Sequence, residues 1–198
     1  MVQSYEGMVK ENSDVTVWNR AFETLAEIVE YGRKKYGDFA PELFILDGST
    51  DFMFDLKVWL DDYMEFLEQE EEQEQLEKVC RKLLKLFAWE KASPSDIRFR
   101  LASSMLSLNK KKEAGDFCER WYGEDENDPA AAAALIYAWI ADRRYKDAQK
   151  VVDFWMDKEG GYTEENAEVF GAAAVLQNVF PGNGKDIQVQ YCSSCNKL

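Results

Sequence analysis

Apolar residues recur along the middle of the chain with the spacing of one face of an α-helix. Three sets have the spacing i, i+4, i+7, and each set begins 34 residues after the previous one. The sets are Cys80, Leu84 and Phe87; Ala114, Cys118 and Trp121; and Ala148, Val152 and Trp155. This pattern predicts the same helix three times and is typical of a helical repeat.

Residues that favour helix N-termini recur with nearly the same period. Each predicted helix pair is preceded by a short polar side chain whose oxygen can accept a backbone hydrogen bond, and two of these residues are followed by proline. The caps Ser93-Pro94, Asp128-Pro129 and Thr163-Glu164 are 35 residues apart, and residues 49–51 can cap an earlier helix outside this period. Together with the apolar faces they predict four helix pairs, over residues 49–90, 93–123, 128–159 and 163–198.

The start of the chain follows a different pattern. Residues 1–12 show no periodicity and are predicted to be a loose arm. Asp14 can cap an amphipathic helix that continues to about Tyr36, where a glycine follows. A short helical turn is expected within residues 38–48, behind a proline.

We therefore expect a single all-α domain over residues 1–198. Its first part, residues 1–48, is an atypical helical region, and residues 49–198 are antiparallel helix pairs stacked side by side. A last helix is expected from about Lys185, although residues 187–191 also alternate as a short strand would.

The best-formed repeats resemble the tetratricopeptide repeat family, in which 34 residues form two antiparallel helices. Ala114 and Ala148 resemble the small residue that opens the second helix, and Tyr145 also fits that pattern. The glycine usual before the second helix is replaced by Asn109 in one repeat and by Arg143 in the next. The resemblance implies a short right-handed α-solenoid, and another family of helical repeats is the alternative.

Such families bind a peptide or a protein helix in a concave groove lined by their first helices. Carried over to this chain, the groove positions are Asp96, Phe99, Arg100, Ser103, Leu106, Ala130, Ala133, Tyr137, Ile140 and Ala141. We expect Phe99, Arg100, Ser103, Leu106, Ala133, Tyr137 and Ile140 to bind the partner. An alanine floor with aromatic neighbours suits an apolar or aromatic segment. The alternative is that these side chains pack against a neighbouring repeat or a terminal helix.

The net charge of −14 is concentrated at one end of the chain. Residues 1–77 contain 20 acidic and 6 basic residues, whereas the remainder contains 18 of each. This distribution disfavours nucleic acid and anionic membranes and favours a basic protein partner. Predicted turns carry the acidic run Glu68–Glu74 and then the basic runs 110–112 and 143–146, a change of sign that would also suit head-to-tail self-association.

The sequence offers few groups for catalysis. It has no histidine, and its acidic runs lack the apolar neighbours that would raise a carboxylate pKa. Cys192 and Cys195 are the one motif with reactive potential, as inert thiols, as ligands of a metal shared between chains, or as a redox pair. We expect no catalytic residue, no metal site and no cofactor, and the alternative is a metal- or redox-dependent module or enzyme that uses these cysteines or clustered carboxylates.

The beginning of the sequence and its cysteine use favour a cytoplasmic protein. No secretory leader or long apolar run is recognisable, and Cys80 and Cys118 lie on apolar helix faces rather than in a disulfide framework. The sequence therefore predicts a non-catalytic adaptor or chaperone-like scaffold that binds a protein or peptide.

Overall fold

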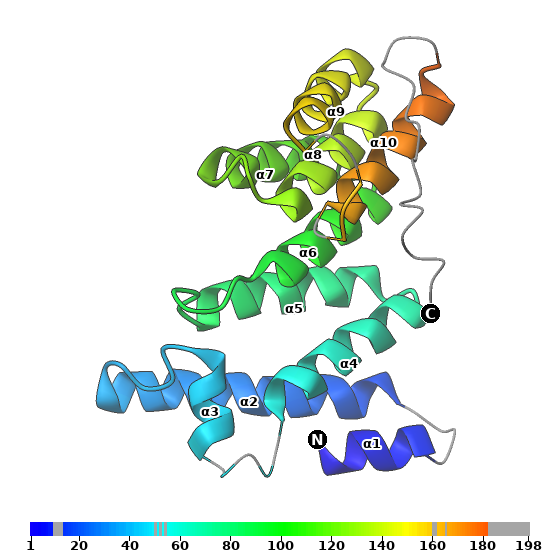
Figure 1. Cartoon of the computed structure of the whole chain (residues 1–198). Coiled ribbons are helices and arrows are strands. Elements are labelled where there is room, and N and C mark those ends of the chain that lie inside the picture. The colour runs from blue at the N-terminus through cyan, green and yellow to red at the C-terminus, as the bar shows by residue number, and fades with distance from the viewer. Residues whose placement is uncertain are drawn as a thin grey trace, which may run out of the picture. The chain divides into compact units, whose positions relative to one another are not determined.

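The structure is a computed structural model that describes residues 1–9, 14–49, 51, 53, 55–159, 162–164 and 166–181. These residues form an all-α fold without strands, as predicted (Figure 1). The helices are α1 (Val2–Val9), α2 (Val15–Tyr36), α3 (Leu43–Ser49), α4 (Leu56–Gln69), α5 (Gln73–Leu86), α6 (Ser95–Ser107), α7 (Lys111–Glu124), α8 (Pro129–Ala141), α9 (Tyr145–Glu159) and α10 (Ala167–Val179). Several helices that follow one another in the chain pack together: α1 on α2, α3 on α4 and α4 on α5 in the first unit, and α7 on α8, α8 on α9 and α9 on α10 in the second.

The chain divides into two compact units, Met1–Leu101 and Ala102–Leu198. The boundary falls inside the continuous helix α6. The single domain predicted from the sequence stays a prediction, because a boundary within one helix does not by itself separate two cooperative folding units.

An aromatic cluster forms the core of the first unit. Trp18 of α2 is fully buried and its ring stacks on those of Trp59, Tyr63 and Phe66 of α4, with centroids 5.6 to 5.8 Å apart. The predicted α2 is confirmed, and the Asp14 side chain caps it by accepting from the backbone N–H of Thr16 at 2.8 Å. Burial of large aromatic rings stabilises the packing of α2 on α4.

The predicted loose arm at residues 1–12 is wrong for residues 2–9, which form α1. The ring of Tyr5 packs edge-on against Trp18 at 5.8 Å, and its hydroxyl donates to Asp62 Oδ2 at 2.7 Å. Two turns of helix are too short for a clear apolar period. The contacts that order α1 come from residues distant in the sequence, so local pattern does not reveal them.

Helix α4 begins later than predicted. The expected cap at residues 49–51 is wrong, because α3 continues through Ser49 and α4 starts at Leu56. Asp55 is the N-cap and its Oδ1 accepts from the N–H of Val58 at 2.9 Å, while Asp47 Oδ1 accepts from the N–H of Leu56 at 2.7 Å. Several side chains in this segment could cap a helix, and the two that satisfy the first-turn N–H groups define its start.

Three helix pairs share the same tight turn. In each, one residue has a left-handed backbone: Glu71 between α4 and α5, Asn109 between α6 and α7, and Arg143 between α8 and α9, with φ of 58°, 59° and 61°. The N–H of the next residue donates to the carbonyl five positions earlier, at 2.8 to 2.9 Å, which is the Schellman pattern of a helix C-terminus. Asn109 and Arg143 are the positions where the sequence resemblance expects glycine, and left-handed φ explains that preference.

The shared turn corrects the predicted register of the first pair. Ala114 and Ala148 lie five residues after their left-handed residue, and the equivalent position after Glu71 is Leu76 rather than Cys80. The equivalent buried set in α5 is Leu76, Cys80 and Leu83, whereas Leu84 is only half-buried. An apolar face that extends over several turns matches itself after a shift of one turn, so periodicity alone leaves this register open.

Replacing Glu71 by glycine is expected to raise the free energy of unfolding by about 1 kcal/mol. A left-handed backbone costs a residue with a β-carbon about 1–2 kcal/mol, and glycine avoids most of that cost. Urea unfolding of the full chain measures the change. Glu72→Gly is the matched control: Glu72 has φ of −78°, so glycine there should not stabilise. Equal effects of both substitutions would contradict the strain at Glu71.

In the second unit, the alanine-rich helix α8 starts as predicted. Asp128 Oδ1 accepts from the N–H groups of Ala130 and Ala131 at 3.0 and 3.3 Å, and Pro129 is the first helical residue. Helices α7, α9 and α10 all pack on α8 (Figure 1). Small side chains allow three neighbours to approach one helix closely.

The predicted cap of α10 at Thr163 is wrong by one turn. Helix α10 begins at Ala167, and Asn166 is its N-cap. Thr163 N–H donates to Asn166 Oδ1 at 2.8 Å and Asn166 N–H donates to Thr163 Oγ1 at 3.3 Å, so the two residues close a turn before the helix. The helix expected from Lys185, and with it Cys192 and Cys195, lies outside the described residues.

Candidate functional site

The groove positions predicted on α8 are largely covered within the second unit. Ala133 is completely buried, and Tyr137 and Ile140 are half-buried. Tyr137 lies one turn after Ala133 on the same helix face. A β-carbon added at Gly171 of α10 would lie 3.7 Å from the Tyr137 hydroxyl oxygen, so α10 passes directly over this face.

The covering helix contributes its own apolar face. The buried residues of α10 are Val169, Phe170, Ala172, Ala173 and Leu176. Figure 1 shows α10, in orange, running across α8. The chain's own α10 therefore lies next to Tyr137 on this face of α8, which supports the packing alternative raised from the sequence.

The predicted positions on α6 are more accessible. Ser103 is exposed, and Phe99, Arg100 and Leu106 are half-buried. Arg100 Nη1 pairs with Glu68 Oε2 near the end of α4, so this guanidinium already has a carboxylate partner. Of the predicted binding residues, Ser103 is the one that lies fully at the surface.

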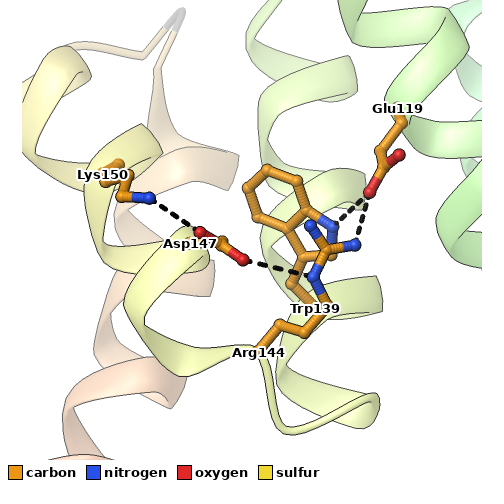
Figure 2. Close-up of polar contacts among 5 residues, drawn as sticks. All are labelled: Glu119, Trp139, Arg144, Asp147 and Lys150. Atoms are coloured by element: carbon orange, nitrogen blue, oxygen red, sulfur yellow. Dashed lines mark hydrogen bonds and ion pairs between the residues drawn. The ribbon is translucent and has the colours of Figure 1, made fainter.

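A polar network links α7, α8 and α9 on the surface of the second unit. Figure 2 shows the Arg144 guanidinium over the Trp139 ring, 4.7 Å from its centre, and both side chains reaching Glu119. Trp139 Nε1 donates to Glu119 Oε1 at 2.9 Å and Arg144 Nη1 donates to the same oxygen at 2.5 Å. Arg144 Nε also donates to Asp147 Oδ2 at 3.3 Å, and Lys150 Nζ donates to Asp147 Oδ1 at 2.8 Å.

This network lowers the pKa of both of its carboxyl groups. The hydrogen bonds from Trp139 and then Arg144 lower the pKa of Glu119, and those from Lys150 and then Arg144 lower the pKa of Asp147. Arg144 is therefore neutralised by two carboxylates. The positive charge predicted for the edge formed by these turns is smaller than the sequence suggests, because Arg144 is paired with Glu119 and Asp147.

The first unit contains a small cavity of about 110 Å³. Its walls come from α3, α4, the segment between α5 and α6, and the start of α6. The lining residues are Leu43, Phe44, Asp47, Lys57, Leu60, Asp61, Met64, Trp89, Ala92, Ser93, Pro94, Asp96 and Ile97. The volume is well below the roughly 300–1,000 Å³ of cofactor and drug-sized sites, so the cavity suits a single side chain.

No pattern in the sequence marks this cavity. Its lining residues come from four segments, and none of them follows a spacing that marks a site. The one available signal was the cluster of Trp89, Pro94 and Asp96 between two helix pairs, which the pattern of caps explains equally well.

Few groups in the described part of the chain are suited to chemistry. Cys80 and Cys118 are buried, and burial raises the pKa of each thiol to about 12, which disfavours the reactive thiolate. Within the described ranges, no three side chains of the metal-binding types come together. Among the same residues, no helix is both long and apolar enough to cross a bilayer.

No protein-family model, curated protein or solved structure matches this chain. The tetratricopeptide resemblance therefore stays a hypothesis that rests on residue spacing and on the geometry of the turns.

Proposed function

We propose that the protein is a non-catalytic adaptor or chaperone-like scaffold built from tetratricopeptide-like helix pairs, and that it binds a peptide or helix of a protein partner in the cytoplasm. The observation that carries the proposal is the turn geometry shared by three consecutive pairs, with a left-handed residue at Glu71, Asn109 and Arg143. Stacked pairs of this kind form a right-handed α-solenoid, an architecture that presents extended surfaces to partners.

The expected partner is basic. The acidic excess of the chain lies within residues 1–77, and complementary charge accelerates association and selects partners. In α4 and the turn that follows, exposed carboxylates include Glu65, Glu70 and Glu71. The sequence-based site on α6 and α8 remains part of the proposal through Ser103, Phe99 and Leu106, which retain exposed surface.

Fluorescence anisotropy with labelled peptides tests this function. A panel of amphipathic peptides rich in lysine and arginine should bind the full chain, whereas peptides of the same apolar pattern with glutamate in place of the basic residues should not. Binding should weaken between 50 mM and 300 mM salt, because screening reduces attraction between exposed charges. Equal binding of both sets, or no binding of either, would count against the proposal.

A further inference from the structure

Helix α2 carries a second row of apolar side chains besides the one that it buries in the first unit. The buried residues are Trp18, Phe22, Ala26, Val29 and Gly32. The second row advances in alternating steps of four and three residues, which is the spacing of a coiled-coil seam. It consists of Val17, Ala21, Thr24, Ile28 and Tyr31, which we call the α2 seam.

The α2 seam lies at the surface of the first unit. Ile28 is 54% exposed and Tyr31 is 66% exposed, whereas the first two residues of the seam are half-buried. The Thr24 hydroxyl donates to the carbonyl oxygen of Arg20 at 2.8 Å, so its polar group is satisfied within the helix and its methyl group is available for apolar contact. Large exposed apolar side chains that share one stripe are typical of an interface.

A groove of about 780 Å³ runs beside the first four residues of the seam. Its walls are the start of α1 and one side of α2 from Thr16 to Ile28, and Leu56 and Trp59 of α4 also line it. Val2 of α1 is 60% exposed and adds apolar surface to the wall. A second helix that lies along α2 can therefore place apolar side chains in this groove.

Two opposite charges flank the α2 seam on the same side. Arg20 and Glu27 are exposed and seven residues apart, and neither forms an ion pair with another described side chain. When two copies of a helix pack antiparallel about a two-fold axis, the same flank of each copy faces the other. Arg20 of each copy then lies next to Glu27 of the other. A parallel pair would place Leu25 and Gly32 opposite these charges, and neither offers a partner.

The antiparallel arrangement also places large side chains opposite small ones. With the two-fold axis near Thr24, Ile28 of one copy lies beside Ala21 of the other, and Tyr31 lies opposite Val17. The groove beside Ala21 provides room for the isoleucine side chain. The α2 seam is thus complementary to itself in both charge and size, as an interface between two identical copies requires.

We propose that the α2 seam is the interface of a homodimer in which two copies of α2 pack antiparallel about a two-fold axis near Thr24. The dimer does not depend on the proposed adaptor function, because its residues are separate from those assigned to the basic partner. It closes on itself, unlike the head-to-tail association that the charges of the turns would suit. One helix from each copy makes a small interface, so we expect a dissociation constant on the order of 50 µM.

Sedimentation equilibrium of the full chain tests the dimer. The mean mass should rise from that of one chain at about 5 µM protein towards that of two chains at about 300 µM, as mass action with this dissociation constant requires. Unfolding measured at about 5 µM or below therefore reports on the single chain. If the mass stays at that of one chain over the whole range, the dimer is wrong and the α2 seam is left to a different protein.

A carboxylate in the α2 seam should dissociate the dimer. Ile28→Asp should raise the dissociation constant at least about tenfold, because dimerisation would bury an unpaired charge. Val58→Asp is the matched control: Val58 of α4 is 49% exposed and lies outside the seam, so the constant should stay within about twofold. Circular dichroism checks that both variants fold. Equal effects of the two substitutions would overturn the assignment of the interface to α2.

Charge reversal tests the antiparallel arrangement. Arg20→Glu and Glu27→Arg should each raise the dissociation constant about fivefold, because each turns two symmetric attractions into repulsions. Net charge alone predicts opposite effects, since the first change makes the chain more acidic and the second makes it less so. The double variant exchanges the signs and should return the constant to within about twofold of the original. Single reversals without effect, or a double variant no tighter than either single one, would overturn the arrangement.

Discussion

Replacing Trp18 by alanine is expected to lower the free energy of unfolding by about 4 kcal/mol, as large-to-small changes of buried aromatic residues do. Trp18 is fully buried and its ring touches Tyr5, Trp59, Tyr63 and Phe66, so the change removes the centre of the aromatic cluster. Urea unfolding followed by circular dichroism measures the loss.

A matched aromatic residue on the same helix is the control. Tyr31 of α2 is 66% exposed, and Tyr31→Ala should change the free energy of unfolding by less than about 0.5 kcal/mol. If Trp18→Ala were as mild as Tyr31→Ala, the packing of α2 on α4 described here would be wrong.

The second large effect is expected at the floor of α8. Ala133→Leu should lower the free energy of unfolding by about 2 kcal/mol, because Ala133 is completely buried in a helix on which α7, α9 and α10 all pack. An open groove would instead tolerate the larger side chain at little cost. Equilibrium unfolding in urea, with tryptophan fluorescence as the signal, distinguishes the two results.

Ser103→Leu is the control for this substitution. Ser103 belongs to the same predicted binding surface but is exposed, so leucine there should change the unfolding free energy by less than about 0.5 kcal/mol. Similar, small effects at both positions would mean that α10 leaves the face of α8 accessible, and would restore the alanine floor as a docking surface.

Helix positions were predictable where one strong cap stands before an apolar run. Asp14 and Asp128 each accept from N–H groups of the first turn, and the helices that follow them start where the sequence predicts. Where several capping residues lie close together, as between Asp47 and Asp55, the sequence does not show which of them will accept hydrogen bonds from the first-turn N–H groups, which have no partner within the helix. For the same reason the sequence predicts the cap of α10 at Thr163, whereas the observed N-cap is Asn166.

The candidate sites were less predictable than the helices. The predicted groove residues follow from the repeat. The accessibility of those on α8 depends on the packing of α10, whose apolar face contacts α8 only in the folded chain. The cavity depends on four segments that approach one another around Leu60 and Trp89. Neither arrangement has a local spacing that sequence reasoning could detect.

The sequence by itself determined the all-α class, the tight turns between paired helices and the acidic excess of residues 1–77, because helix periodicity, caps and charge are properties of neighbouring residues. Only the tertiary structure decided the register of α5, the complete burial of Ala133, the pairing of Arg144 with Glu119 and the existence of the cavity. These depend on contacts between residues far apart in the chain, whose energies come from packing and desolvation rather than from local conformational preference.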